Sequence, residues 1–296
     1  MGMHLWQVLR WVREDRDVLT CPEKYVTAVK EECADFMQQG FAQSAAQAGP
    51  YPIGGKQEWQ YQFVHTSMHE KLQRIYSLNK IAGEGADFDR VLQVMDWLCT
   101  HTQYNGMSIW SAYLFQRHEN SLRMLRYAYD KSFARALNCK HRALLLADCL
   151  LALGMPSLPL WLRNVSPQED GSVVTFKHCV VHAWLANERC WVMLDPSFNA
   201  FVTDERGDPL HLVDIHERHR QGQSLLLGRY SFNGTQDCES TYLEGFLLAS
   251  LQCIFVRNST KDSHDPRNCL SPEDAPHENN KIHAITMAEL LAEPLF

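Results

Sequence analysis

The chain has too few basic residues for a nucleic-acid surface and no apolar run long enough for a membrane span. Its 35 acidic residues outnumber its 28 basic ones, so the net charge is −7 and no overall positive surface is left to neutralise phosphates. The longest apolar run, residues 143–153, contains Asp148 and falls short of the roughly 20 residues that cross a bilayer. Neither nucleic acid nor a membrane is therefore expected as a partner.

The basic residues that do gather form two short clusters. One lies at 218–220, and the other consists of Arg135, Lys140, His141 and Arg142. Short runs of charge are typical of solvated faces. Both clusters are therefore expected at the surface.

Cysteine spacing and the start of the chain exclude further classes. The ten cysteines include no CxxC pair, the spacing typical of zinc and dithiol sites. No basic segment followed by an apolar run and a small-residue cleavage site opens the chain, so no secretory signal is expected. The sequence thus predicts a cytoplasmic protein with reduced thiols.

The remaining composition is that of a globular protein. Of 296 residues, 45% are hydrophobic, and the 15 glycines and 12 prolines are ordinary numbers. Residues 4–39 carry apolar side chains at helical spacing, and residues 44–56 have the composition of a loop. We therefore expect an N-terminal helical extension over 1–60 and one larger domain over 61–296.

Hydrophobic periodicity in the larger domain predicts an α+β fold. Helices are expected over 69–77, 88–101, 112–129, 143–153 and 240–256, strands over 158–162, 173–184 and 190–194, and an exposed loop over 261–281. Helix 143–153 is apolar on nearly all sides, which is typical of a buried helix. Gly154 and Pro156 are expected to end it. A polar turn at 187–188 is expected to join the last two strands as a hairpin.

Three reactive residue types occur in this order of elements. Cys139 lies at the first turn of the buried helix, histidines lie on the first hairpin strand, and Asp195 ends the second. A helix N-terminus lowers the pKa of a thiol, and its N–H groups, here that of Cys139, can hold a developing oxyanion. An imidazole can take the thiol proton, and a carboxylate on its far nitrogen fixes the tautomer. The set predicts nucleophilic chemistry at a carbonyl group.

The same segments resemble the core of the transglutaminase-like superfamily. The likeness lies in the sequences NCKHRALLL (138–146), LGMP (153–156), HCVVHAW (178–184) and WVMLDPSF (191–198). It is strongest over 138–215, extends more weakly from about residue 65 to the C-terminus, and favours the bacterial stand-alone members. These have an Asp-Pro-Ser/Thr-Phe-Asn segment that leads into an Asp-Glu-x-Gly turn, as at 195–199 and 204–207 here.

The resemblance implies a papain-like core, in which a central buried helix packs against an antiparallel sheet. It implies that Cys139 is the nucleophile and that Asp195 is the orienting carboxylate. Residues 1–60 have no counterpart in the family.

Either of two histidines could complete the set. His182 belongs to the His-Ala-Trp sequence of many members, whereas His178 fits the His-x-Val-x-x-x-Trp strand of some bacterial ones. A hairpin centred on the expected turn places His182 opposite Met193 and Val180 opposite Asp195, so the two histidines flank the aspartate diagonally. In family members with short hairpins, the catalytic histidine lies two residues before the strand residue that pairs with the aspartate. This relation selects His178 and leaves His182 as the alternative.

A zinc site is another interpretation of the hairpin, since His178, Cys179, His182 and Cys190 lie near one another in sequence. Strand alternation, however, sends Cys179 to the opposite sheet face from the two histidines, so a shared tetrahedral ion is not expected. No metal and no cofactor is therefore expected.

The residue set and the resemblance together predict a thiol-dependent acyltransferase or amide hydrolase. Cys139 would attack an amide or thioester of a peptide, protein or carrier-bound acyl group, and the acyl group would pass to an amine or to water. Substrate selection is expected from residues 1–60 and from an insertion at 165–175, because loops on a rigid core commonly carry it. The alternatives are a cysteine protease or amidase and an inactive peptide-binding module of the same fold.

Overall fold

The computed structural model of the chain describes residues 63–106, 120–129, 131, 135–167, 173–236, 239, 242–248, 253–256 and 283–284. Helices and antiparallel strands both occur along these residues, which confirms the predicted α+β class. The expected N-terminal helices and the expected loop at 261–281 lie outside the described residues.

The main sheet has five antiparallel strands in the order β3-β2-β1-β6-β7. They are β1 (Ser157–Pro167), β2 (Val173–Leu185), β3 (Cys190–Leu194), β6 (Cys253–Val256) and β7 (His283–Ala284). Two short strands, β4 (Phe201–Thr203) and β5 (Leu226–Arg229), form a separate ladder. The three strands expected between 158 and 194 are thus confirmed, whereas the sequence pattern does not predict β4, β5, β6 or β7.

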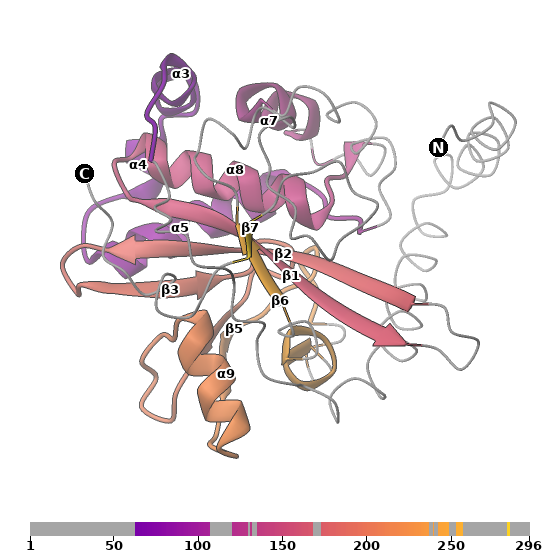
Figure 1. Cartoon of the computed structure of the whole chain (residues 1–296). Helices are drawn as coiled ribbons and strands as arrows, with labels where there is room; N and C mark the ends of the chain where they lie inside the picture. The colour runs from indigo at the N-terminus through magenta and orange to yellow at the C-terminus, as the bar shows by residue number, and fades with distance from the viewer. Residues whose placement is uncertain are drawn as a thin grey trace, which may run out of the picture.

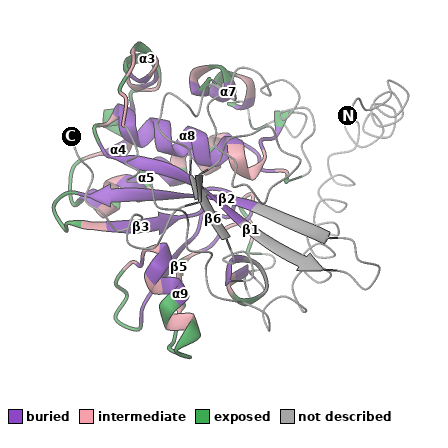
Figure 2. Cartoon of the chain, viewed as in Figure 1, coloured by how far each residue is buried: buried purple, intermediate pink, exposed green. Residues whose placement is uncertain are grey.

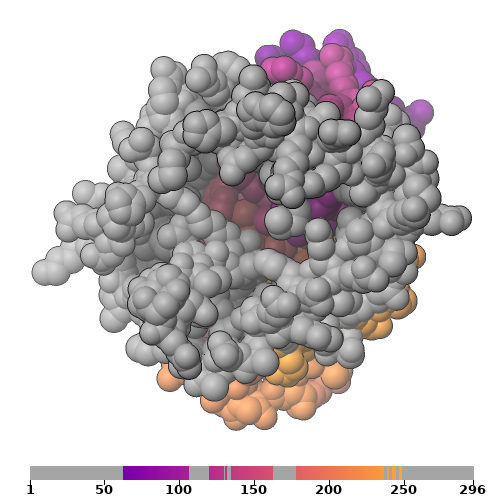
Figure 3. Space-filling model, turned by 90° about the vertical axis from the view of Figure 1, so that its right-hand side faces the viewer, coloured from indigo at the N-terminus to yellow at the C-terminus, as the bar shows by residue number. Residues whose placement is uncertain are grey.

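Helices cover one side of the main sheet, and a smaller group of elements lies on the other (Figure 1). The helices of the first side are α3 (Ser67–Tyr76), α4 (Leu78–Ala82), α5 (Asp87–His101), α7 (Ser121–Ala128) and α8 (Cys139–Ala152). The second side carries α9 (Leu212–Arg220) and β5. In the turned view of Figure 3, indigo and magenta residues form the upper edge and orange residues form the lower edge. No helix among the described residues is long and apolar enough to cross a membrane.

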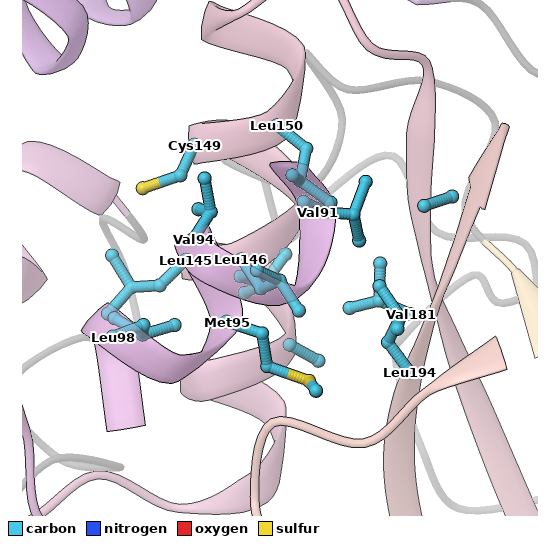
Figure 4. Packing of buried hydrophobic residues seen from close by; sticks show 14 of the residues in the cluster. Val91, Val94, Met95, Leu98, Leu145, Leu146, Cys149, Leu150, Val181 and Leu194 are labelled. Atoms are coloured by element: carbon cyan, nitrogen blue, oxygen red, sulfur yellow. The ribbon is translucent and has the colours of Figure 1, made fainter. Parts of the chain in front are cut away.

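Helix α8 forms the centre of the larger apolar core. Every residue from His141 to Ala152 is buried (Figure 2). Leu145 and Leu146 belong to one cluster with Val91 of α5 and Val181 of β2 (Figure 4). Burying one such aliphatic side chain contributes about 1.5–3 kcal/mol, so the cluster fixes α8 firmly against the sheet. The prediction of a buried helix is confirmed.

Glycine ends α8 as the sequence predicts. Gly154 has a φ of 77°, in the left-handed region, and its N–H donates to the Leu151 carbonyl at 2.9 Å. The N–H of Met155 donates to the Leu150 carbonyl at 3.0 Å. This pair of bonds is the Schellman motif, and it turns the chain sharply from α8 into β1.

The central strands alternate strictly between two cores. On β2, the residues that belong to the cluster around α8 are Cys179, Val181, Ala183 and Leu185. Val180 and Trp184 belong instead to a second cluster, which includes Leu212 of α9. In the β2–β3 hairpin, His182 pairs with Met193, which confirms the predicted register.

Residues 240–256 differ from the single helix that the sequence predicts. Their described residues form a π-helix, η3 (Tyr242–Leu247), and then β6, in which Phe255 pairs with Trp161 of β1. A short apolar run cannot be assigned to helix or buried strand by periodicity alone. The run Cys253–Val256 contains Ile, Phe and Val, which favour strands. The helix prediction is therefore wrong for 253–256.

The basic cluster at 135–142 differs as well. His141 and Arg142 are buried inside the protein rather than solvated, Lys140 is partly buried, and Arg135 is exposed. The expectation of a solvated face is therefore wrong here, because both side chains lie on a helix that is surrounded by protein. Of the helix expected over 112–129, the described part is α7.

Candidate functional site

The site begins at the N-terminus of α8. Asn138 is the N-cap residue, and its Oδ1 accepts a hydrogen bond from the His141 N–H at 3.1 Å, as is typical of a helix start. Cys139 follows as the first helical residue and is partly exposed. Amides of the first turn have no acceptor within the helix and carry its partial positive charge. The backbone N–H of Cys139 is one of them.

His178 and Asp195 form the second part of the site. His178 Nε2 donates to Asp195 Oδ2 at 2.7 Å, and both side chains are fully buried. The hairpin brings them together, since β3 ends at Leu194 and Asp195 is the next residue. The histidine that contacts the aspartate is therefore His178 and not His182.

Three donors hold the Asp195 carboxylate. Besides His178, the Tyr242 hydroxyl donates to Oδ2 at 2.8 Å, and the Ser197 N–H donates to Oδ1 at 2.9 Å. A buried carboxylate without such donors would be strongly destabilising. Burial, together with the charge of Asp195, holds the pKa of Tyr242 well above its ordinary value, so the phenol stays a neutral donor. Tyr242 lies in η3, and the sequence analysis did not identify it.

The electrostatics of the site favour a thiolate beside an imidazolium. The pKa of Cys139 lies well below its ordinary value, and the largest cause is a hydrogen bond from Cys179. Burial raises this pKa, whereas the hydrogen bond with His178 and the charge of His178 lower it further. Burial alone would lower the pKa of His178, but the charge of Asp195 and hydrogen bonds with Asp195 and Cys139 raise it to about 9. Because Nε2 is bonded to Asp195, Nδ1 is the ring nitrogen that remains for the thiol. Between these two pKa values, the thiol proton resides on the imidazole.

Cys179 is part of this arrangement although it lies on the other sheet face. The predicted alternation is correct, since Cys179 belongs to the cluster around α8. Cys139, however, packs against both apolar clusters and so meets Cys179 from the end of α8. Among the described residues, no group of three or more His, Cys, Asp or Glu side chains is placed to hold a metal ion. The contact between the two thiols is a feature that the sequence analysis missed.

His182 has a different environment from His178. Its Nε2 accepts a hydrogen bond at 3.1 Å from the backbone N–H of Leu212, the first residue of α9, and its ring stacks on Trp191. Burial, followed by the charge of His211, holds the pKa of His182 well below its ordinary value. His182 is therefore a neutral side chain that caps a helix.

The three side chains thus come from different elements, with Cys139 on α8, His178 on β2 and Asp195 directly after β3. Neither a protein-family model nor a curated protein matches the chain. The function is therefore argued from the geometry of the site and from the motifs that contain its residues.

Proposed function

We propose that this protein is a thiol-dependent acyl-transfer enzyme of the transglutaminase-like kind, built on a papain-like core. The proposal is carried by one connected set, in which the His178 imidazole lies between the partly exposed Cys139 thiol and the buried Asp195 carboxylate. Cys149 of the same helix provides a contrast, since burial raises the pKa of its thiol far above the ordinary value. That is how a structural cysteine behaves, and Cys139 does the opposite.

In the proposed reaction, the Cys139 thiolate attacks the carbonyl carbon of an amide or thioester. The oxyanion forms beside the Cys139 N–H at the start of α8. His178 donates its proton to the departing amine or thiol, and a thioester acyl-enzyme remains. An incoming amine or water then attacks this thioester and gives a proton to His178, which becomes an imidazolium again. The tetrahedral intermediate then breaks down, releasing the amide or acid and restoring the Cys139 thiolate.

The surroundings of the base favour an amine over water as the final acceptor. His178 and Asp195 have no exposed surface, so the proton relay is shielded from bulk solvent. Transfer to an amine yields an amide, whereas transfer to water yields the free acid. The expectation that residues 1–60 and 165–175 select the substrate concerns segments largely outside the described residues, and it stays a prediction.

The test is to trap the acyl-enzyme on Cys139. The protein is incubated with p-nitrophenyl acetate, quenched in acid and mapped by peptide mass spectrometry, with Cys139→Ala as the control. We expect one acetyl group on Cys139 at neutral pH. A primary amine such as glycine ethyl ester is then added, and the acetylated amine indicates transfer while acetate alone indicates hydrolysis. A Cys139 that stays unacylated would contradict the proposal and favour the inactive binding module.

A further inference from the structure

A buried positive charge lies one turn after Cys139 and takes no part in the reaction described above. Arg142 of α8 is only 1% exposed. Residues three apart on a helix lie on the same face, so its side chain leaves α8 on the side of the site. Its Nη1 donates to the Pro196 carbonyl at 2.8 Å and to the Ser197 carbonyl at 3.4 Å, and its Nη2 donates to the Thr102 carbonyl at 2.6 Å.

These contacts hold the turn that directly follows Asp195. Pro196 and Ser197 supply two of the carbonyl oxygens, and the Ser197 N–H is itself a donor to the Asp195 carboxylate. The Cys99 thiol of α5 donates to the same Pro196 carbonyl at 3.1 Å. The guanidinium therefore links α8, the end of α5 and the Asp195 turn at a single point.

The charge of Arg142 has no adjacent counterion. No described carboxylate lies within ion-pair distance of it, although a buried charge is costly without compensation. The titratable groups that act on it are Cys99, Tyr104 and Asp195. Burial raises the pKa of Cys99 to about 11, and a tyrosine is neutral at pH 7. Of these three groups, Asp195 is therefore the one that acts on Arg142 as an anion.

The reactive form of the site is electrically neutral only when Arg142 is included. The thiolate of Cys139, the imidazolium of His178, the carboxylate of Asp195 and the guanidinium of Arg142 sum to zero. Without the guanidinium, the thiolate, the imidazolium and the carboxylate would leave one net negative charge in a buried environment. Cys139 feels that carboxylate directly, since the charge of Asp195 opposes ionisation of the thiol.

We propose that Arg142 is a positioning residue of this site, which clamps the 195–197 turn so that Asp195 faces His178 and which compensates the aspartate charge so that Cys139 ionises. This inference rests on the proposed function, because it concerns the same thiol. Variants should separate the clamping of the turn from the compensation of charge. Lysine keeps the positive charge but lacks the planar fork that reaches two carbonyl groups at once.

The experiment measures the pH dependence of iodoacetamide labelling at Cys139, read by peptide mapping, in wild type, Arg142→Met and Arg142→Lys. We expect the midpoint to rise by about one pH unit in Arg142→Met, a tenfold lower thiolate fraction at pH values below the midpoint. Arg142→Lys should lie between this variant and the wild type. Asp148→Asn is the matched control, because Asp148 is buried in the same helix but bonds His69 and Ser121 away from the site.

The outcomes are distinguishable. A wild-type midpoint in both folded Arg142 variants would overturn the inference and reduce Arg142 to a structural residue like Asp148. If Arg142→Met does not fold, the shift in Arg142→Lys decides alone, and an unshifted midpoint there overturns the inference. A wild-type protein whose Cys139 labels only at alkaline pH would instead show that the proposed function itself has failed.

Discussion

Replacing His178 by glutamine should reduce the acidity of the Cys139 thiol. Two groups lower the pKa of Cys139, namely the Cys179 thiol and the His178 imidazolium, while burial and the charge of Asp195 raise it. Glutamine retains a polar side chain but not the positive charge. The pKa of Cys139 should then rise, because the Cys179 hydrogen bond alone is left to oppose burial and the charge of Asp195. Each unit of that rise lowers the thiolate fraction below the midpoint about tenfold.

The assay is the rate of iodoacetamide labelling at Cys139 between pH 5 and 10. The informative quantity is the midpoint of the profile, because thiolates of low pKa are intrinsically weaker nucleophiles and absolute rates partly cancel the effect. Wild type should label with a midpoint well below the ordinary value of about 8.5, and His178→Gln with a clearly higher midpoint than wild type. Circular dichroism would establish that the variant is folded.

His182→Gln is the matched control on the same strand. Its labelling profile should equal that of wild type, whereas its free energy of unfolding should fall by about 1–3 kcal/mol because the bond to Leu212 is lost. A raised midpoint in His182→Gln with an unchanged one in His178→Gln would refute the reasoning, since it would mean that the other histidine serves the thiol.

Three further predictions concern neighbouring groups. Tyr242→Phe should lower the free energy of unfolding by about 1.5–3 kcal/mol, because Asp195 loses a charged hydrogen bond; unchanged urea denaturation would show that this bond contributes nothing. Cys179→Ala should raise the labelling midpoint of Cys139, because it removes the leading cause of the lowered pKa, and an unshifted profile would contradict the thiol contact. His182 binds its proton less readily in the folded protein than in the unfolded chain. Stability should therefore fall as the pH drops below about 6.5, by up to about 1.4 kcal/mol per pH unit, a slope that His182→Gln should reduce. His178, with its raised pKa, contributes no slope in that window, since it is protonated in both states.

Local signals in the sequence predicted the elements that carry the site. The apolar run after Cys139 and the glycine at 154 determined where α8 lies and how it ends. The polar turn at 187–188 predicted the hairpin register, which left His178 and His182 diagonal to Asp195. The choice of His178 came from the resemblance to family members with short hairpins, and the structure pairs this histidine with Asp195. The strand at 253–256 could not be assigned in the same way, because its pairing partner on β1 lies far earlier in the chain.

The residues that the sequence analysis missed all form hydrogen bonds with partners far away in the sequence. Tyr242 meets Asp195 across 47 positions, and Arg142 meets Pro196 across 54. An arginine at the start of an apolar helix has the same local sequence whether it is solvated or buried. Only the packing of α5 and the Asp195 turn around α8 decides between the two, and no periodicity encodes that packing.

The most direct test of the account is the ultraviolet absorbance of the Cys139 thiolate near 240 nm, measured as a difference between wild type and Cys139→Ala across the pH range. The account predicts a thiolate that is already present at pH 7, with a titration step well below the ordinary value of about 8.5. It also predicts that the thiolate signal does not change when His178 deprotonates near its pKa of about 9, because Cys139 is a thiolate on both sides of that step. A single step at or above about 8.5 would contradict the account, because Cys139 would then be an ordinary thiol at the end of a buried helix.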